Sequence, residues 1–261
     1  MVFIIYLRIF LKIILMNRTG GIIFVRMNSS RLPGKAMIEI NGVSLLERVI
    51  ERAKQISRID HLCVATSIDK EDDIIASFSK SKNVDIYRGS LSDVAIRASE
   101  TCEKFNYDSF LRICGDRPFF DISIYDKLIE IHNIESNDIT TNVFPRTVPP
   151  GLSGEVISTN SLKLTIEKSN NQEHREHITK YFYENPNLFK IRNVQNNSIS
   201  KEKVSFRLVI DNLQDLKRAT WIDKKINKKD INADYNQIID LAFEWENNNN
   251  NNSKYGNIRN T

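Results

Sequence analysis

Short apolar runs alternate along this chain with stretches in which apolar residues recur every three or four positions. Apolar runs such as 22–25 and 109–114 are typical of strands buried in a parallel sheet. Leu46, Val49 and Ile50 have the spacing of a buried helix face. The pattern predicts strands at 22–25, 61–65, 84–87, 109–114, 138–141, 155–158 and 204–210. It predicts helices starting near 45, 70, 93, 122 and 212, and two more over 160–168 and 173–184.

Strands that alternate with helices build a sheet whose helices cover both faces. We therefore expect an α/β fold with a mostly parallel, Rossmann-like sheet. The pattern occupies 17–246 and indicates a single domain, with an apolar extension at 1–16. Six consecutive asparagines follow from Asn247, and we expect 247–261 to be a disordered tail.

The first sixteen residues are apolar but shorter than the roughly 20 residues that a membrane-spanning helix needs. Arg8 and Lys12 interrupt them on one helical face, and no small-residue cleavage site of a secretory signal follows. Three interpretations remain open. The segment is an interfacial amphipathic helix, it packs on the domain or on a partner chain, or it precedes a true start at Met16.

The composition fits a globular protein that handles a small anion. The net charge of +4 is mild and, without a basic stripe that carries stacking aromatics, does not indicate nucleic-acid binding. Three cysteines, Cys63, Cys102 and Cys114, have no paired spacing, so we expect free thiols in a reducing cytoplasm.

A polar, cationic loop follows the first apolar run. It contains Arg26, Ser29, Arg31 and Lys35, with Pro33-Gly34 as turn residues. It is not a P-loop, because Ser29 stands in place of the first glycine and Ala36 follows the lysine. Since open α/β sheets bind ligands beyond the carboxyl ends of their strands, this loop predicts a phosphate site.

Two aspartates follow predicted strands. Asp116 comes after 109–114 and Asp211 after 204–210. Taken singly, each is an ordinary turn or helix-start aspartate. Together, at the sheet edge that carries the cationic loop, they predict a Mg²⁺ site, because this ion often takes one or two carboxylates plus phosphate oxygens.

The motif R-x-x-S-x-R-L-P-G-K at 26–35 resembles that of the SpsF-like cytidylyltransferases, relatives of the CMP-Kdo and CMP-sialic acid synthetases. The resemblance covers about residues 21–220. Further motifs in the same order carry it: VATSIDKEDD (64–73), YRGSLSDV (87–94), RICGDRP (112–118), GLSGEV (151–156), EHREHIT (173–179) and LVIDNLQDL (208–216).

The resemblance implies a GT-A-like nucleotidyltransferase that uses CTP and Mg²⁺ to make a CMP-activated, acidic sugar for surface polysaccharide. It implies that Arg26, Ser29, Arg31 and Lys35 bind the triphosphate, with the three cations acting in catalysis. It places Thr66, Arg88, Ser90 and Asp93 near the nucleotide, Glu155, Glu176 and His177 on the sugar side, and Asp116 and Asp211 on the metal. The length and charge pattern of 1–16 disfavour a membrane partner, and a homodimer stays open.

Other functions stay open. One is a sugar-1-phosphate nucleotidyltransferase or a GT-A-like glycosyltransferase, although no D-x-D motif lies near Asp116. Another is a catalytically degenerate nucleotide-binding protein, because Phe24-Val25 and the loop at 150–154 depart from the family pattern. A third is a membrane-associated scaffold that uses 1–16.

Overall fold

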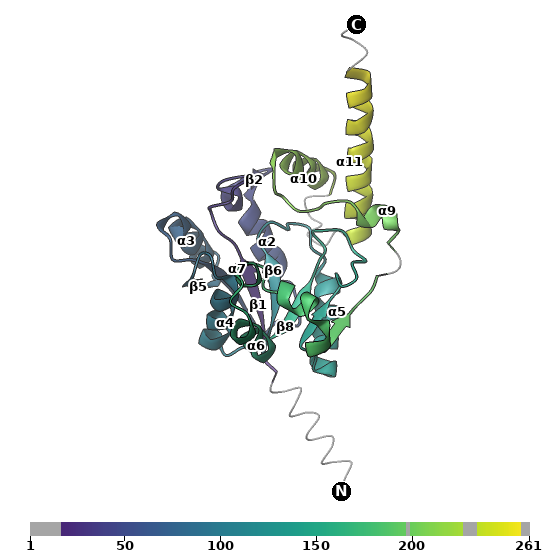
Figure 1. Ribbon diagram of the computed structural model, residues 1–261. Helices are drawn as coiled ribbons and strands as arrows, with labels where there is room; N and C mark the ends of the chain where they lie inside the picture. The colour runs from purple at the N-terminus through teal and green to yellow at the C-terminus, as the bar shows by residue number, and fades with distance from the viewer. Residues whose placement is uncertain (1–16, 197–198, 227–233, 257–261) are drawn as a thin grey trace.

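The computed structural model describes residues 17–196, 199–226 and 234–256 (Figure 1). The predicted extension at 1–16 lies outside the described residues, as does the end of the predicted tail at 257–261. Within the described ranges, no helix is long and apolar enough to cross a membrane.

A seven-stranded, mostly parallel sheet forms the centre of the molecule. Its strands lie in the order β5-β4-β1-β6-β8-β7-β9. Parallel pairing joins β5, β4, β1 and β6, and also β7 and β9, whereas β8 runs antiparallel to both of its neighbours. The strands are β1 (Thr19–Phe24), β4 (His61–Ser67), β5 (Asp85–Gly89), β6 (Ser109–Cys114), β7 (Ile139–Thr141), β8 (Glu155–Ser158) and β9 (Ile191–Asn193). A separate hairpin pairs β2 (Glu39–Ile40) with β3 (Val43–Ser44).

The central strand β1 is buried on both sides, which explains its continuous apolar sequence. Ile23 pairs with Val64 of β4 and with Ile113 of β6. Successive side chains of a strand point to opposite faces, so Ile22 and Ile23 belong to two different hydrophobic clusters. Both residues are fully buried.

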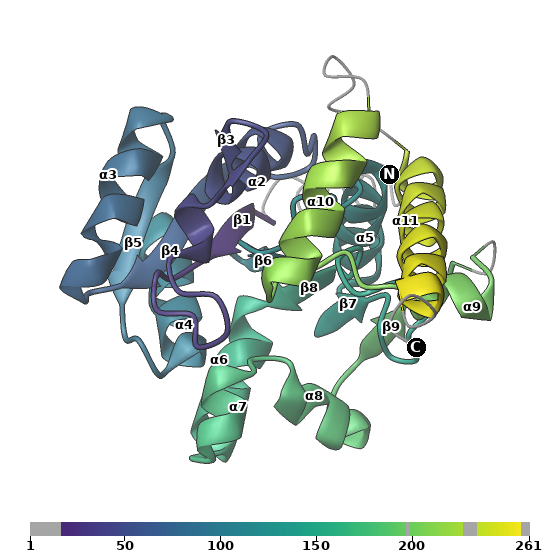
Figure 2. The ribbon, with the colours of Figure 1, turned by 90° about the horizontal axis from the view of Figure 1, so that it is seen from above.

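Helices cover both faces of the sheet (Figure 2). On the face of Ile23 lie α2 (Leu45–Ala53), α3 (Asp73–Ser81), α5 (Ile122–Glu135), α10 (Leu213–Lys225) and α11 (Tyr235–Gly256). On the face of Ile22 lie α4 (Val94–Phe105), α6 (Thr159–Lys168) and α8 (Lys180–Glu184). Shorter elements are η1 (Lys35–Met37), η2 (Lys70–Asp72), α7 (Gln172–Glu176), η3 (Pro186–Leu188) and α9 (Lys201–Val204). The predicted α/β fold with helices on both faces is confirmed.

The prediction of a strand over 204–210 is wrong. Val204 ends α9, and the residues after it form no ladder with any strand. Instead, the Leu208 N–H donates to Pro150 O, and the Ile210 N–H donates to Asp116 O. Leu208 and Ile210 are buried, so the apolar sequence reflects an irregular segment that crosses the sheet edge rather than a strand.

The chain remains helical where a disordered tail was predicted. Helix α11 continues past Asn247 to Gly256. Its first half is anchored by Ile238, Ile239 and Ala242, which are buried against the core. Propagating an anchored helix costs little per residue, so polar residues beyond the anchor can continue it.

Candidate active site

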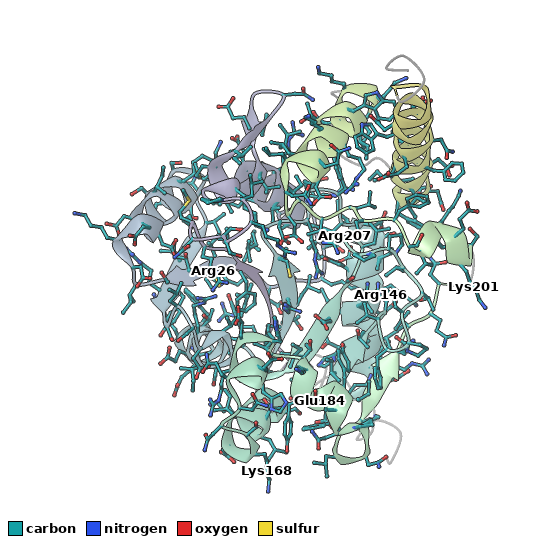
Figure 3. All side chains as sticks on the ribbon, turned by 45° about the horizontal axis from the view of Figure 1, so that its top comes forward. Arg26, Arg146, Lys168, Glu184, Lys201 and Arg207 are labelled. Atoms are coloured by element: carbon teal, nitrogen blue, oxygen red, sulfur yellow. The ribbon has the colours of Figure 1, made fainter. Side chains whose placement is uncertain are left out.

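The site lies at the carboxyl ends of β1 and β6, at the edge where open parallel sheets bind ligands. A pocket of about 320 Å³ opens there, and its lining includes Phe24 at the end of β1 and Cys114 at the end of β6. Figure 3 looks toward this end of the sheet and labels Arg26 in the loop after β1 and Arg207 in the segment before α10. Eight of the predicted site residues line the pocket: Arg26, Ser29, Arg31, Lys35, Asp116, Glu176, His177 and Asp211.

The cationic loop is folded by its own backbone and by one carboxylate beneath it. The Met27 O accepts hydrogen bonds from the N–H groups of Ser29 and Gly34, both 2.9 Å long. The Met27 N–H donates to Asp72 Oδ1 at 2.7 Å. Gly34 has φ of 73°, a conformation that favours glycine, and the chain then turns into η1. This turn directs Lys35 into the pocket.

Lys35 is the centre of the site. Its Nζ donates to Asp116 Oδ2 at 2.9 Å, to Asp211 Oδ1 at 3.1 Å and to the Ile210 carbonyl at 2.9 Å. Its side chain is only 15% exposed. The two aspartates predicted to bind metal therefore converge on one ammonium group, although Asp211 does not follow a strand.

The second oxygen of Asp211 meets two further cations. Asp211 Oδ2 lies 2.7 Å from Arg207 Nη2 and 3.1 Å from Arg31 Nη2. Its backbone N–H donates to Asp215 Oδ2 at 3.0 Å, in the capping box that starts α10. The start of a helix thus fixes the backbone of Asp211 in the site.

Gly115, which lines the pocket, also allows the two strands to pack closely. Its N–H donates to the Phe24 carbonyl at 2.9 Å. A Cβ atom at this position would lie 2.8 Å from the Val25 Cβ, which is closer than real contacts allow. The glycine therefore lets β1 and β6 continue side by side into the site.

The other side of the pocket is formed by α7. Arg26 Nη2 lies 3.3 Å from Glu176 Oε1, and His177, which follows α7, also lines the pocket. Both members of the Arg26–Glu176 pair are more than a third exposed, so the pair is weakly held. The pair joins Arg26, which we expected at the triphosphate, to Glu176, which we expected at the sugar.

Five predicted residues do not line this pocket, and their roles stay predictions. Thr66 is fully buried and donates to Asp72 Oδ2, while Arg88 binds the carbonyls of Ser67 and Asp69. Ser90 and Asp93 organise the start of α4. The Ser90 Oγ accepts the Asp93 N–H, and Asp93 caps the helix by accepting the Ile96 N–H.

Glu155, the fifth, sits behind the pocket wall. Its carboxylate accepts from Arg112 Nη1 at 2.6 Å and from the Tyr183 hydroxyl at 2.8 Å. Burial alone would raise its pKa, but the charge of Arg112 and the bond from Tyr183 outweigh burial and hold the pKa below its ordinary value. Glu155 therefore stays ionised and orients Arg112, which does line the pocket.

Sequence reasoning missed two pocket cations, Arg97 and Arg112. The available signal was position: Arg97 interrupts a face of α4 that is otherwise made of small residues, Ala98 and Cys102 among them. The three cysteines are free, as predicted, and Cys114 is the one that lines the pocket. Burial raises the pKa of Cys63 and Cys102 to about 12, so neither is a reactive thiol.

The donor set fits Mg²⁺. This ion is commonly held by one or two carboxylates and completes its shell with phosphate oxygens and water. Asp116 and Asp211 supply two carboxylates that already converge on one positive charge, the ammonium of Lys35. Among the residues that the structure describes, no group of three or more His, Cys, Asp or Glu side chains could hold a metal ion. An ion on Asp116 and Asp211 would therefore need phosphate oxygens and water as its further ligands.

Known proteins are similar in sequence to this chain along most of its length. The family model described as Cytidylyltransferase matches residues 21–249. The chain belongs to the cytidylyltransferase family. The matched segment includes every residue that lines the pocket.

Three similar proteins illustrate the relationship of this chain to other proteins. An uncharacterized protein of Methanocaldococcus jannaschii is 34% identical over 221 residues, which cover 85% of this chain and 88% of that one. The spore coat polysaccharide biosynthesis protein SpsF of Bacillus subtilis is 28% identical over 242 residues, or 88% of this chain and 99% of SpsF. A solved cytidylyltransferase of Leptospira borgpetersenii has a TM-score of 0.81 at 26% identity and covers 88% of this chain and 96% of that one. The predicted resemblance is confirmed, as is the nucleotidyltransferase fold.

Proposed function

We propose that this protein transfers CMP from CTP to a sugar hydroxyl, with release of pyrophosphate, in the synthesis of a surface polysaccharide. One observation carries the proposal: Lys35, in the cationic loop, meets Asp116 and Asp211 at the carboxyl edge of the sheet. A triphosphate needs cations around its oxygens and, in most such enzymes, a carboxylate-bound metal. The family and the name of SpsF support the nucleotide and the pathway class.

In this reaction the sugar oxygen attacks the α-phosphorus of CTP in line with the departing pyrophosphate. Catalysis depends mainly on positioning and on neutralising the oxygens that gain charge. Arg26, Arg31 and Lys35 are the candidates for the β- and γ-phosphates, and Ser29 offers a hydroxyl donor beside them.

Asp116 and Asp211 would hold Mg²⁺, which supplies Lewis-acid polarisation of the phosphate oxygens when bound. These carboxylates are also what keeps Lys35 in the pocket, since both accept hydrogen bonds from its ammonium. A phosphate group that enters the pocket would bring further negative charge to the Lys35 ammonium and would share this ammonium with the two carboxylates.

The acceptor would enter from the α7 side. Glu176 and His177 line the pocket there, and Glu155 fixes Arg112 in its wall. A guanidinium in this position suits an acidic sugar, because it binds carboxylates through paired N–H groups.

A pyrophosphate-release assay tests the proposal. The purified protein is given each of the four ribonucleoside triphosphates, with and without MgCl₂, and a panel of sugar acids that includes Kdo and sialic acid. We expect release that requires CTP, one sugar acid and Mg²⁺. Binding of CTP by calorimetry without turnover across the panel would instead favour the degenerate nucleotide-binding protein. Failure to bind any triphosphate would contradict the proposal.

A further inference from the structure

The positive charges of the pocket are balanced by carboxylates, with one exception. Lys35 and Arg31 meet Asp211, Arg26 meets Glu176, and Arg112 meets Glu155; Arg97 pairs with no carboxylate among the residues that the structure describes. The pairs are Lys35–Asp116, Lys35–Asp211, Arg31–Asp211, Arg26–Glu176 and Arg112–Glu155.

Arg97 is also deeply placed. The residue is only 3% exposed, yet it lines the pocket from α4. Its Nη1 donates to the Ser90 carbonyl at 2.8 Å, whereas its buried Nε meets no acceptor within the described part of the chain. Its guanidinium carbon lies 6.0 Å from the centre of the Phe24 ring. An aromatic face and one carbonyl offset only part of the cost of burying a charge.

The backbone leaves room for this arrangement. Gly89, at the end of β5, lies beside the stem of Arg97, and a Cβ atom there would be 3.1 Å from the Arg97 Cγ. Thus three neighbours position the arginine: the Gly89 backbone along its stem, the Ser90 carbonyl at its tip and the Phe24 ring across its plane.

A second positive charge lies close to Arg97. Burial first, and then the charge of Arg26, lower the pKa of Arg97 to about 10, against a partial opposing effect of Asp72. The Asp72 oxygens already accept hydrogen bonds from Met27, Thr66 and Ser67, and Asp72 forms no ion pair with Arg97 in the described part of the chain. Two guanidinium groups that repel each other across a pocket are an arrangement that a bound anion stabilises.

We propose that Arg97 is a nucleotide-binding residue of the site, and that its guanidinium binds a phosphate oxygen of the substrate together with Arg26. The inference rests on the proposed function, because it takes the ligand to be a nucleoside triphosphate. It adds a cation from α4, outside the loop at 26–35, and gives a reason for an arginine to stay buried without a counter-charge.

A purely structural role makes a different prediction. If Arg97 served packing alone, its loss would lower the melting temperature and leave ligand affinity unchanged in the folded protein. An uncompensated buried charge behaves in the opposite way: replacing it costs little stability, while the ligand loses a charge-assisted hydrogen bond.

The test is calorimetric titration of CTP into wild-type protein, Arg97→Gln and Arg97→Lys, in MgCl₂ and without a sugar. We expect Arg97→Gln to weaken CTP binding roughly 10- to 100-fold, the size of one lost charge-assisted bond. Its melting temperature should match or exceed that of the wild type. Arg97→Lys should recover part of the affinity, since it keeps the charge but not the guanidinium geometry.

Arg192→Gln is the matched control. Arg192 lies on the edge strand β9, is half-exposed and pairs with Glu135. The substitution therefore removes the same charge as Arg97→Gln but lies outside the pocket. Cytidine, measured by its displacement of CTP, should bind wild type and Arg97→Gln equally. Unchanged CTP affinity in Arg97→Gln, or an equal loss for cytidine, would overturn the inference while leaving the proposed function standing. Wild-type protein that binds no nucleoside triphosphate would contradict the proposed function itself.

Discussion

The ammonium of Lys35 lies 2.9 Å from the carboxylate of Asp116, although 81 residues separate them in the chain. The same nitrogen reaches Asp211 at 3.1 Å. Both aspartates are at most a quarter exposed in their side chains, so the three groups interact where solvent screening is reduced. This relationship makes Lys35 the most informative residue to change.

Replacing Lys35 with Met should reduce pyrophosphate release by about two to three orders of magnitude, because a preorganised charge is lost from the triphosphate site. Steady-state kinetics with CTP would measure the effect on kcat/KM. Lys127→Met is a suitable control, since Lys127 is largely exposed on α5 and away from the pocket. Activity of Lys35→Met within ten-fold of wild type would contradict the assignment.

The same variant should respond more strongly to Mg²⁺. Without Lys35, Asp116 loses this ion pair and Asp211 keeps only Arg31 and Arg207. The two carboxylates then carry more unbalanced negative charge, which a divalent cation would relieve. We expect saturating MgCl₂ to raise the melting temperature of Lys35→Met by roughly 3 °C or more beyond its effect on the wild type. The measurement is thermal unfolding, with NaCl at equal ionic strength for comparison.

The extra stabilisation should disappear in the double variant Lys35→Met/Asp211→Asn, which retains only one of the two carboxylates. An equal response to NaCl and MgCl₂ in Lys35→Met would show that the carboxylates bind no specific cation.

Thr66→Val should affect stability more than activity. The Thr66 hydroxyl donates to Asp72 Oδ2 at 2.7 Å, and the other oxygen of Asp72 accepts the Met27 N–H of the cationic loop. Although burial opposes it, these bonds hold the pKa of Asp72 below its ordinary value. Losing one donor to a buried carboxylate should cost about 1–3 kcal/mol of unfolding free energy.

Urea unfolding measures that loss, and turnover per folded molecule should remain within a few-fold of wild type. Ser81→Ala serves as the comparison, because Ser81 is exposed and its hydroxyl donates to the Phe78 carbonyl within its own helix. A large loss of CTP affinity in folded Thr66→Val would instead place Thr66 at the nucleotide.

The buried His132 should make the fold sensitive to mild acid. Burial lowers the pKa of His132 from 6.5 to about 4, against a small opposing effect of Asp138. The unfolded chain therefore takes up a proton at higher pH than the folded protein. The corresponding stability is fully present above about pH 6.5 and is lost as the pH falls toward 4, by about 3 kcal/mol in total.

Unfolding free energies of wild type and His132→Gln, measured from pH 7.5 to 4, test this expectation. The loss of the His132–Thr140 contact shifts the variant at every pH, so the comparison concerns the slopes. Between pH 6.5 and 4 the variant should have the shallower slope. Parallel curves would mean that His132 does not titrate differently in the two states.

The sequence predicts the structure correctly where a residue's surroundings depend on its neighbours along the chain. Strands β6 and β8 begin and end where the apolar runs do, because continuous burial and the flanking turns are local signals. The loop at 26–35 was recognisable for the same reason. The sequence also predicts that Asp116 and Asp211 lie close together. In the structure, however, Asp211 follows an irregular segment that ends at Ile210, and not a strand.

Tertiary context decided the rest. The residues at 204–210 alternate like a strand, yet their backbone groups bond to Pro150 and Asp116 one at a time, and no local pattern distinguishes this from a ladder. The small neighbours of Arg97 on α4 indicate a buried position, but nothing near it in sequence reveals that its guanidinium lies beside Phe24.

The contacts of Lys35 also connect the site to a part of the chain that is synthesised late. One of its carboxylates and its carbonyl partner come from residues 210 and 211, more than 170 positions later in the chain. A nascent chain that has folded only its first five strands still lacks the segment that holds this lysine in place. Turnover should therefore begin only after the chain up to Asp211 has left the ribosome and docked beside Lys35.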